Sequence, residues 1–166
     1  MSSKPYAESC EQNKQPIRQV LDQYTSGRKT VLEIGSGTGQ HAVYFADCYP
    51  SLEWQTSDLP ENHQGIRAWI EESHLNNLYP PISLDANGSW PKQHYDLLFT
   101  ANTIHIMSQS SVESFFANCP QCMHDGSTLL MYGPFNYQGK YTSESNARFD
   151  EWIKREYKVS SIKNFE

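Results

Sequence analysis

The sequence has few basic residues and gathers none of them into a cluster. Its 13 lysines and arginines are outnumbered by 19 aspartates and glutamates, which gives a formal net charge of −6. Proteins that hold nucleic acid through its phosphates need a basic surface. We therefore expect no nucleic-acid partner, although this composition leaves room for a small basic groove.

Long apolar runs are also missing. No stretch reaches the roughly 18 apolar residues that a membrane span needs. The first residues, Met1 to Pro5, lack the apolar core of a signal peptide. We therefore expect no membrane partner and a cytoplasmic location. The 166 residues are enough for one domain with a buried core.

Cysteine is scarce, with four residues in the chain. Cys119 and Cys122 form a C-x-x-C pair near His124, but a zinc site needs a second pair, and the sequence has none. A thioredoxin-type pair opens a helix, whereas this pair follows a predicted one. We interpret these thiols as structural or incidental and expect no metal.

A glycine-rich turn is the most informative feature that is present. Residues 30–34 have the β-branched and apolar composition of a strand, which runs directly into Gly35, Gly37 and Gly39. A helical pattern begins near Gln40. A strand, a tight turn and a helix form the entry to a nucleotide-type site, where glycines permit positive φ and close approach of a ligand.

The spacing of these glycines separates two classes of ligand. The dinucleotide motif is G-x-G-x-x-G, and its third glycine would fall at Gln40. Glu33, at the end of the strand, would repel a diphosphate but attract an ammonium and a sulfonium. S-adenosylmethionine carries both of these cations and no phosphate. The sequence therefore favours S-adenosylmethionine over a nicotinamide dinucleotide, and a tight turn without a ligand is the alternative.

Two aspartates follow later predicted strands. Asp58 comes after residues 52–56, 19 positions beyond Gly39, where a carboxylate can accept hydrogen bonds from ribose hydroxyls. Asp85 follows a strand at residues 82–84, which Pro80 and Pro81 introduce, and it could accept the adenine amino group. The alternatives are a solvated or capping aspartate at the first position and a turn cap at the second.

Segments with the hydrophobic spacing of helices alternate with predicted strands along the rest of the chain. We expect further strands at residues 95–100 and 128–132, a turn at residues 125–126, and helices near residues 16–26, 42–49, 66–73, 112–119 and 149–157. This alternation predicts an α/β fold with a doubly wound, Rossmann-like parallel sheet and right-handed crossovers. Residues 1–166 form one domain, in which the leader at residues 1–13 is a loose tail or folds over the ligand.

Five segments together resemble a known family. The glycine loop and the acids that follow it resemble class I S-adenosylmethionine-dependent methyltransferases. A narrower resemblance is to the methyltransferase-like protein 26 family, a domain of unknown function, and it extends over residues 11–17, 35–42, 101–106, 132–135 and 142–150. The resemblance implies the fold and the cofactor, but no substrate. It implies that Glu33, Gly35, Gly37 and Gly39 approach the methionine part, Asp58 the ribose and Asp85 the adenine, with Ser36, Ala86 and Asn102 completing the set.

The sequence departs from this family pattern in two places. Gln12 stands where members usually have an arginine, which weakens any role for a cation in the leader. Class I methyltransferases also close the sheet with a C-terminal antiparallel pair of strands, which is missing here because the sequence stops at Glu166. We therefore expect either a truncated chain or an edge strand at residues 128–132 that a partner covers, as in a homo-oligomer.

Methyl transfer is an in-line displacement that depends on holding the nucleophile close to the sulfonium. We expect His105 to be the base and Asn102 to orient the acceptor; a histidine packed beneath the loop is the alternative. Five polar or aromatic side chains are candidates for the acceptor pocket: Tyr6, Tyr132, Asn136, Tyr141 and Asn146.

The sequence therefore predicts a methyltransferase that acts on an unidentified small molecule or protein. The alternatives are a binding protein without turnover and an NAD-dependent oxidoreductase, which Glu33 and Gln40 disfavour.

Overall fold

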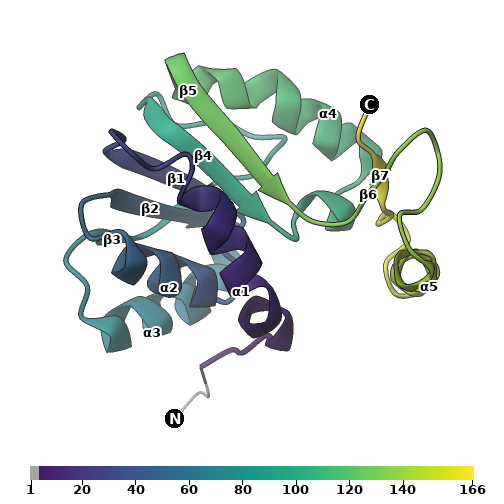
Figure 1. Ribbon diagram of the computed structural model, residues 1–166, viewed down its shortest axis with the longest axis horizontal. Helices are drawn as coiled ribbons and strands as arrows, with labels where there is room; N and C mark the ends of the chain where they lie inside the picture. The colour runs from purple at the N-terminus through teal and green to yellow at the C-terminus, as the bar shows by residue number, and fades with distance from the viewer. Residues whose placement is uncertain (1–3) are drawn as a thin grey trace.

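A parallel five-stranded sheet forms the centre of the computed structural model, which describes residues 4–166 (Figure 1). The strand order is β3-β2-β1-β4-β5, and each strand runs parallel to its neighbours. The strands are β1 Thr30–Ile34, β2 Glu53–Asp58, β3 Leu78–Ser83, β4 Tyr95–Ala101 and β5 Met123–Tyr132. This is the Rossmann-like doubly wound sheet that the alternation of strands and helices predicts.

Helices cover both faces of the sheet. The five α-helices are α1 Glu8–Leu21, α2 Gln40–Cys48, α3 His63–Ser73, α4 Gln109–Asn118 and α5 Glu144–Glu156. Figure 1 shows α1, α2 and α3 grouped on one side of the sheet and α4 on the other, while α5 lies beyond the ends of the strands. Three short 3-10 turns complete the helical structure: η1 Pro60–Asn62, η2 Ile104–Ile106 and η3 Cys119–Cys122.

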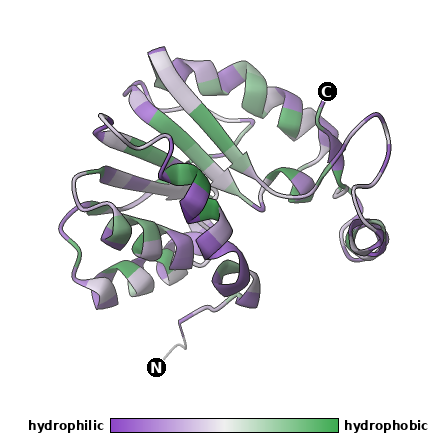
Figure 2. Ribbon diagram, in the orientation of Figure 1, coloured by the Kyte–Doolittle hydropathy of each residue, from purple (hydrophilic) through white to green (hydrophobic). Residues whose placement is uncertain are grey.

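Successive side chains of the central strands point to opposite faces of the sheet, and this divides the core into two clusters. Val31, Leu97 and Phe99 pack with α1 and α2, whereas Leu32 and Leu98 point to the opposite face and pack with α4. Figure 2 shows β4 as largely hydrophobic, as a strand buried on both faces should be. The two clusters hold the carboxyl ends of the strands in fixed positions.

Helix α1 begins at Glu8 rather than at Pro16, so the expectation of an irregular leader up to residue 13 was wrong. The hydrophobic pattern did not reveal the first two turns because Asn13, a polar residue, occupies their buried face. The helix also ends at Leu21 rather than near residue 26, and its Val20 side chain is 46% exposed.

Two strands extend further than the sequence indicates. Strand β3 begins at Leu78 and contains Pro80 and Pro81, which a strand at the edge of a sheet tolerates. Strand β5 begins at Met123, so the turn expected at residues 125–126 is instead a bulge in the pairing with β4. Gly126 has φ +92° at this bulge, and its carbonyl accepts a hydrogen bond from Arg28.

Strand β5 is the last strand of the main sheet. Two shorter strands, β6 Phe135–Asn136 and β7 Lys163–Asn164, pair in parallel with each other, and within residues 4–166 no strand pairs with the outer edge of β5. In the same part of the chain, no helix combines the length and the apolar composition needed to cross a membrane.

Candidate functional site

The glycine loop joins the ends of three strands. The N–H groups of Gly35 and Ser36 both donate to the carbonyl of Ser57 at the end of β2, at 3.0 and 2.9 Å. Thr103, just beyond β4, lies so close to Gly35 that a Cβ on this glycine would be 2.7 Å from the threonine Oγ1. The carboxyl ends of β1, β2 and β4 therefore meet at this loop.

All three glycines have positive φ, but their surroundings differ. At Gly35 (φ +74°) and Gly39 (φ +93°), an added Cβ would meet Thr103 Oγ1 and the Cα of Ile66, the latter at 3.1 Å. At Gly37 (φ +58°), an added Cβ would meet nothing within 4 Å. Packing therefore explains two of the glycines, and Gly37 is the one that faces open space.

Asp58 fixes the shape of the loop. Its Oδ2 accepts the N–H of Gly37 at 2.6 Å, and its Oδ1 accepts the N–H of Leu59 and the side-chain amide of Asn62 at 2.7 and 2.8 Å. A carboxylate has about four lone-pair positions, so Oδ2 keeps capacity for one more donor. The residue predicted to hold a ribose thus also organises the turn.

Glu33 lies beneath the loop and is only 2% exposed. Its Oε2 accepts the indole N–H of Trp54 at 3.0 Å. Burial raises the pKa of this carboxyl to about 7, although hydrogen bonds from Trp54 and Ser36 oppose the rise. The sequence suggests a permanent anion, whereas the buried group is close to half-protonated at neutral pH.

Asp85 and Ala86 lie beyond β3. The Oδ1 of Asp85 accepts the N–H of Asn87 at 2.9 Å, so this exposed side chain forms the turn cap that was one of its two expected roles. Ala86 is buried, and its carbonyl accepts hydrogen bonds from Trp90 and Asn118. Adenine recognition by this pair stays a prediction.

Gln40 connects the loop to the leader, a role that the sequence analysis missed. It is 4% exposed, and its Oε1 accepts the N–H of Ala7 at 2.6 Å and the hydroxyl of Thr38 at 3.1 Å. Its Nε2 donates to Glu11 at 3.4 Å. A polar residue on the buried side of the first turn of α2 was the available signal for this contact.

A second buried polar contact lies beside Gln40. The Nε2 of His41 is 2.7 Å from the side-chain oxygen of Asn13 in α1. Burial lowers the pKa of His41 to about 4, so the imidazole is neutral at physiological pH. Helix α1 therefore packs against the start of α2 through polar as well as apolar contacts.

Residues 4–7, which we name the strap, cross α3. Lys4 pairs with Glu72 at 2.7 Å, and its ammonium lies 3.6 Å from the ring centroid of Trp69. The indole N–H of Trp69 donates to the carbonyl of Pro5 at 2.7 Å. Gly65 is required beneath the proline ring, because an added Cβ would be 2.5 Å from Pro5 Cγ.

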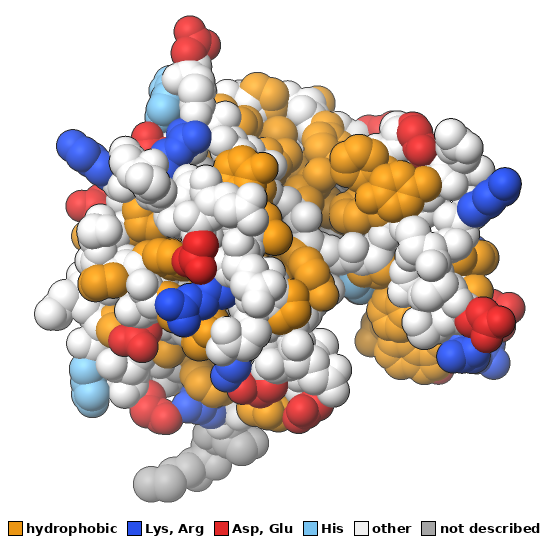
Figure 3. Space-filling model, in the orientation of Figure 1, with side chains coloured by type: hydrophobic (Ala, Val, Ile, Leu, Met, Phe, Trp, Pro, Cys, Tyr) orange, Lys and Arg blue, Asp and Glu red, His pale blue; other side chains and the backbone are white. Residues whose placement is uncertain are grey.

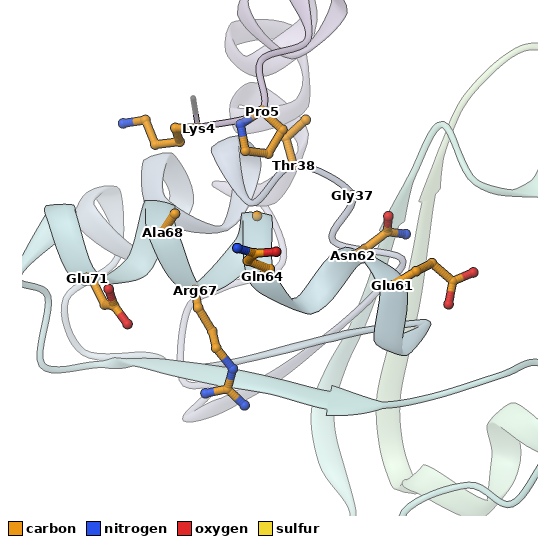
Figure 4. A pocket seen from close by; sticks show the side chains of 11 residues that line it. Lys4, Pro5, Gly37, Thr38, Glu61, Asn62, Gln64, Arg67, Ala68 and Glu71 are labelled. Carbon is orange, nitrogen blue, oxygen red and sulfur yellow. The ribbon is translucent and has the colours of Figure 1, made fainter. Parts of the chain in front are cut away.

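A cavity of about 780 Å³ opens between the strap, the glycine loop and α3. Figure 4 shows Pro5 beside Thr38 above α3, with Gln64 between them and Arg67. The lining includes Gly37 but not Asp85, Asn102 or His105. The cavity therefore borders the predicted cofactor residues on one side only, and the predicted acceptor residues lie elsewhere.

Asn102 and His105 meet beyond β4. Asn102 has φ +57°, an uncommon conformation for a residue other than glycine, and its N–H donates to the carbonyl of Tyr132 at 2.8 Å. A Cβ added to Gly133 would lie 3.8 Å from His105 Nδ1 and 4.0 Å from the Cα of Asn102. These three residues therefore converge at the ends of β4 and β5.

His105 is a buried histidine, with 8% of its surface exposed. Its ring packs edge-to-face on Phe149 of α5, with 5.2 Å between the centroids. Burial, followed by the charge of Lys163, lowers the pKa of His105 to about 4. This packing matches the alternative structural role, although a neutral imidazole can still accept a proton.

The five residues predicted for the acceptor pocket are dispersed. Tyr6 is exposed on the leader and donates to Glu8, Tyr141 donates to Asp150 at 2.6 Å, and Asn146 donates to Thr142 at 2.8 Å. Tyr132 is exposed, and Asn136 is buried with no partner for its Oδ1 among residues 4–166. Over this same range, no hydrogen bond joins any two of the five.

A second cavity of about 630 Å³ lies between α4, β5 and the last residues of the chain. Figure 3 shows hydrophobic side chains gathered on this side of the molecule. Phe116 and Phe165, which line this cavity, are large residues with substantial exposure.

The C-x-x-C pair belongs to the core. Cys119 and Cys122 are buried free thiols in η3, and Cys122 Sγ donates to the carbonyl of Pro91 at 3.2 Å. Burial raises the pKa of Cys122 to about 11, which makes its thiol unreactive. In the part of the chain that the structure describes, no three His, Cys, Asp or Glu side chains are grouped closely enough to hold a metal ion.

One family profile matches almost the whole chain. The family is described as "Protein of unknown function (DUF938)", and the match covers residues 4–166. The description names no activity and no ligand.

Solved methyltransferase structures share the fold. An O-methyltransferase family protein from Burkholderia thailandensis has a TM-score of 0.82 at 15% identity, covering 95% of this chain and 49% of that one. The S-adenosylmethionine-dependent methyltransferase SibL in its apo form has a TM-score of 0.78 at 20% identity, with coverages of 94% and 46%. PigF with SAH has a TM-score of 0.74 at 16% identity, with coverages of 92% and 50%. This chain thus spans about half the length of each structure.

Proposed function

The chain belongs to the DUF938 family, and we propose that it is an S-adenosylmethionine-dependent methyltransferase that acts on a small-molecule or protein acceptor. The narrower relationship to the methyltransferase-like protein 26 family is part of the proposal and rests on the sequence segments that resemble it. The fold shared with solved methyltransferases supports the proposal in its general form.

The glycine loop is the observation that carries the proposal. Its open position, Gly37, lies beside Asp58 at the carboxyl edge of a parallel sheet, where α/β folds bind nucleotides. Gln40 occupies the position of the third dinucleotide glycine, and its buried side chain contacts Ala7, Thr38 and Glu11. The loop therefore suits a nucleoside without a diphosphate.

The residues at this edge have the chemistry that the cofactor requires. We assign the space over Gly35, Ser36, Gly37 and Gly39 to the methionine part, with the Glu33 carboxylate as the countercharge for its cations. The free lone pair of Asp58 is available to a ribose hydroxyl, and Asp85 with Ala86 would border the adenine. The bound cofactor supplies a methyl group on a positively charged sulfur, which is the electrophile of the reaction.

The acceptor would approach from the side of Asn102 and His105. Asn102 would orient the nucleophile, and the neutral His105 would accept its proton, for which it is a weak base because its pKa lies near 4. Tyr132 and Asn136 follow in the same region of the chain, and Tyr6, Tyr141 and Asn146 complete the proposed acceptor set. The acidic net charge favours a small molecule or a protein over nucleic acid.

The weak basicity of His105 also favours a second candidate, a protein that binds S-adenosylmethionine without turnover. Incubation of the protein with methyl-labelled cofactor and either metabolite or protein pools separates the two functions. Label transferred to an acceptor supports the methyltransferase. Tight cofactor binding with no transfer to either pool would favour the binder.

The same assay tests His105 directly. If it is the base, His105→Ala lowers the transfer rate by about 100-fold, the usual contribution of a general base, and leaves cofactor affinity unchanged. Asn77→Ala, which removes an amide bonded to the carbonyls of Ala46, Tyr49 and Leu52 away from the proposed site, serves as the control for general destabilisation. Unchanged transfer by the His105 variant would restrict this residue to packing.

A further inference from the structure

Residues 160–163, near the end of the chain, are hydrogen-bonded to the loop that carries His105. We name residues Ser160–Lys163 the clamp. Ser161 N–H donates to the carbonyl of His105 at 3.0 Å, Ser160 Oγ to that of Ile106 at 2.9 Å, and Lys163 Nζ to that of Met107 at 2.9 Å. Three successive carbonyls of one loop therefore accept hydrogen bonds from a segment more than 50 residues away in the sequence.

Lys163 is the unusual member of the clamp. It is 8% exposed, and its ammonium also donates to the carbonyl and the hydroxyl of Ser161, at 3.0 and 2.9 Å. Its three protons thus have three neutral acceptors, and within residues 4–166 no carboxylate lies within ion-pair distance of it. Burying an ammonium without a counterion is unfavourable, so a role in simple stability explains it poorly.

A second buried charge supports the clamp from α5. Asp150 is buried, and its Oδ1 accepts the N–H of Ile162 at 2.6 Å. Its Oδ2 accepts the hydroxyl of Tyr141 and the ammonium of Lys154. Lys163 also pairs with Phe135 in the short sheet of β6 and β7. The clamp is therefore also held by α5 and by β6.

We propose that Lys163 is a positioning residue, which holds the loop at residues 104–107 so that His105 stays beside Asn102 and Gly133. This inference rests on the proposed function, because it assigns that loop to the acceptor side of the site. A mobile loop would misplace any acceptor, and placement errors of about 1 Å can slow a reaction on the order of 100-fold.

The charges around His105 give this role a measurable signature. Lys163, on β7, is the cation that disfavours a proton on the imidazole. On α5, the side nearest the imidazole is the uncharged ring of Phe149, while Asp150 is paired with Lys154. Removal of the Lys163 charge should therefore raise the pKa of His105, by on the order of one unit.

Three variants test the proposal. Lys163→Met removes the charge and the donors, Lys163→Arg keeps both, and Lys158→Met changes an exposed lysine of the same segment as a control. Hydrogen exchange of the amides at residues 104–107 and NMR titration of the His105 ring are measured for each. We expect Lys163→Met to accelerate that exchange at least tenfold, without acceleration in β1 or α2, and to raise the His105 pKa. Lys163→Arg should keep both the exchange rates and the His105 pKa close to their wild-type values.

The outcome that overturns the proposal is unchanged exchange at residues 104–107 and an unchanged His105 titration in Lys163→Met. Acceleration spread equally over β1 and α2 also overturns it, because that result indicates general destabilisation. If Lys163→Met does not fold, Lys163→Gln removes the charge but keeps a donor for the Met107 carbonyl, and an unchanged His105 titration in that variant is equally contrary to the proposal. These measurements need no cofactor, whereas failure of the wild-type protein to bind S-adenosylhomocysteine would contradict the proposed function alone.

Discussion

Burial controls the charge of Glu33, the carboxylic acid that lies in β1 just before the glycine loop. Its pKa of about 7 means that this side chain is close to half-protonated at neutral pH in the free protein and mostly protonated below it. A cationic ligand nearby favours the ionised form, so binding below pH 7 must release that proton. Under the proposed function, the acid beneath the loop makes the affinity for the cationic cofactor depend on pH.

We predict that S-adenosylmethionine binds more tightly as the pH rises from 6 to 8, by up to about tenfold. Glu33→Gln cannot ionise and should give weaker, pH-independent binding. Calorimetry in two buffers of different ionisation enthalpy measures the released proton. An affinity that is flat in the wild-type protein would show that Glu33 does not interact with the ligand cations.

The three glycines should respond differently to a methyl group. Gly39→Ala combines an unfavourable φ with a contact of 3.1 Å to Ile66 Cα, and we expect a loss of about 2 kcal/mol or more in the free energy of unfolding. Gly37→Ala meets only open space in the free protein and should lose about 1 kcal/mol.

Gly37→Ala should nevertheless weaken S-adenosylhomocysteine binding more than Gly39→Ala does, when the two are compared under conditions in which the same fraction of each variant is folded. Urea unfolding and calorimetry on both variants make the comparison. Equal affinities for the two would mean that the face of Gly37 is not part of the ligand site.

At the scale of elements, the strap and α1 reach the glycine loop through one buried side chain. Gln40→Ala removes the acceptor of the Ala7 N–H and the donor to Glu11. We predict faster hydrogen exchange at residues 5–8 and about fivefold weaker S-adenosylhomocysteine binding, which corresponds to about 1 kcal/mol, the usual value of a hydrogen bond.

Gln23→Ala is the matched control, because Gln23 is exposed just beyond α1 and its amide bonds only the carbonyl of Gln19. An equal change in the control, or no change in Gln40→Ala, would show that the strap and the loop are independent of each other.

The predictability of each element followed the strength of its apolar pattern. Strands β1 and β4 could be predicted within a residue because their apolar runs are long and both faces are buried. The first half of α1 could not, since its buried face carries Asn13, whose partner His41 is distant in sequence. The bulge at Gly126 resembled a turn in the sequence, because a glycine with positive φ occurs in both bulges and turns.

The candidate site was predictable only where local chain geometry fixes it. Three glycines and Asp58 are recognisable from their spacing, and the structure brings them together. The roles of Gln40 and Lys163 depend on tertiary contacts with residues 7 and 107, which no local pattern indicates. Burial, likewise invisible in the sequence, changed the expected charge of Glu33 and the basicity of His105.

At the scale of the whole molecule, two buried histidines make the folded protein less stable in acid. The pKa values of His41 and His105 are lowered from 6.5 to about 4, so each contributes stability above pH 6.5 that is lost as the pH falls toward 4. Glu33 has the opposite sign, because its raised pKa favours the folded state increasingly as the pH falls from 7 to 4.5.

We predict that the free energy of unfolding falls between pH 6.5 and 4, on the order of 1 kcal/mol per histidine after allowance for solvent screening. Glu33→Gln removes the opposing contribution and should steepen the fall. Urea unfolding at several pH values measures both. A stability that rises toward pH 4 in the wild-type protein would mean that these imidazoles are not buried in neutral form.

The central claim is that the glycine loop binds an adenosyl cofactor rather than a dinucleotide. Isothermal titration of the protein with S-adenosylhomocysteine and, separately, with NAD tests it most directly. The account predicts saturable binding of S-adenosylhomocysteine with a Kd of about 1–100 µM, in the range usual for enzyme ligands, and no detectable heat with NAD. Saturable NAD binding without any heat from S-adenosylhomocysteine would contradict it.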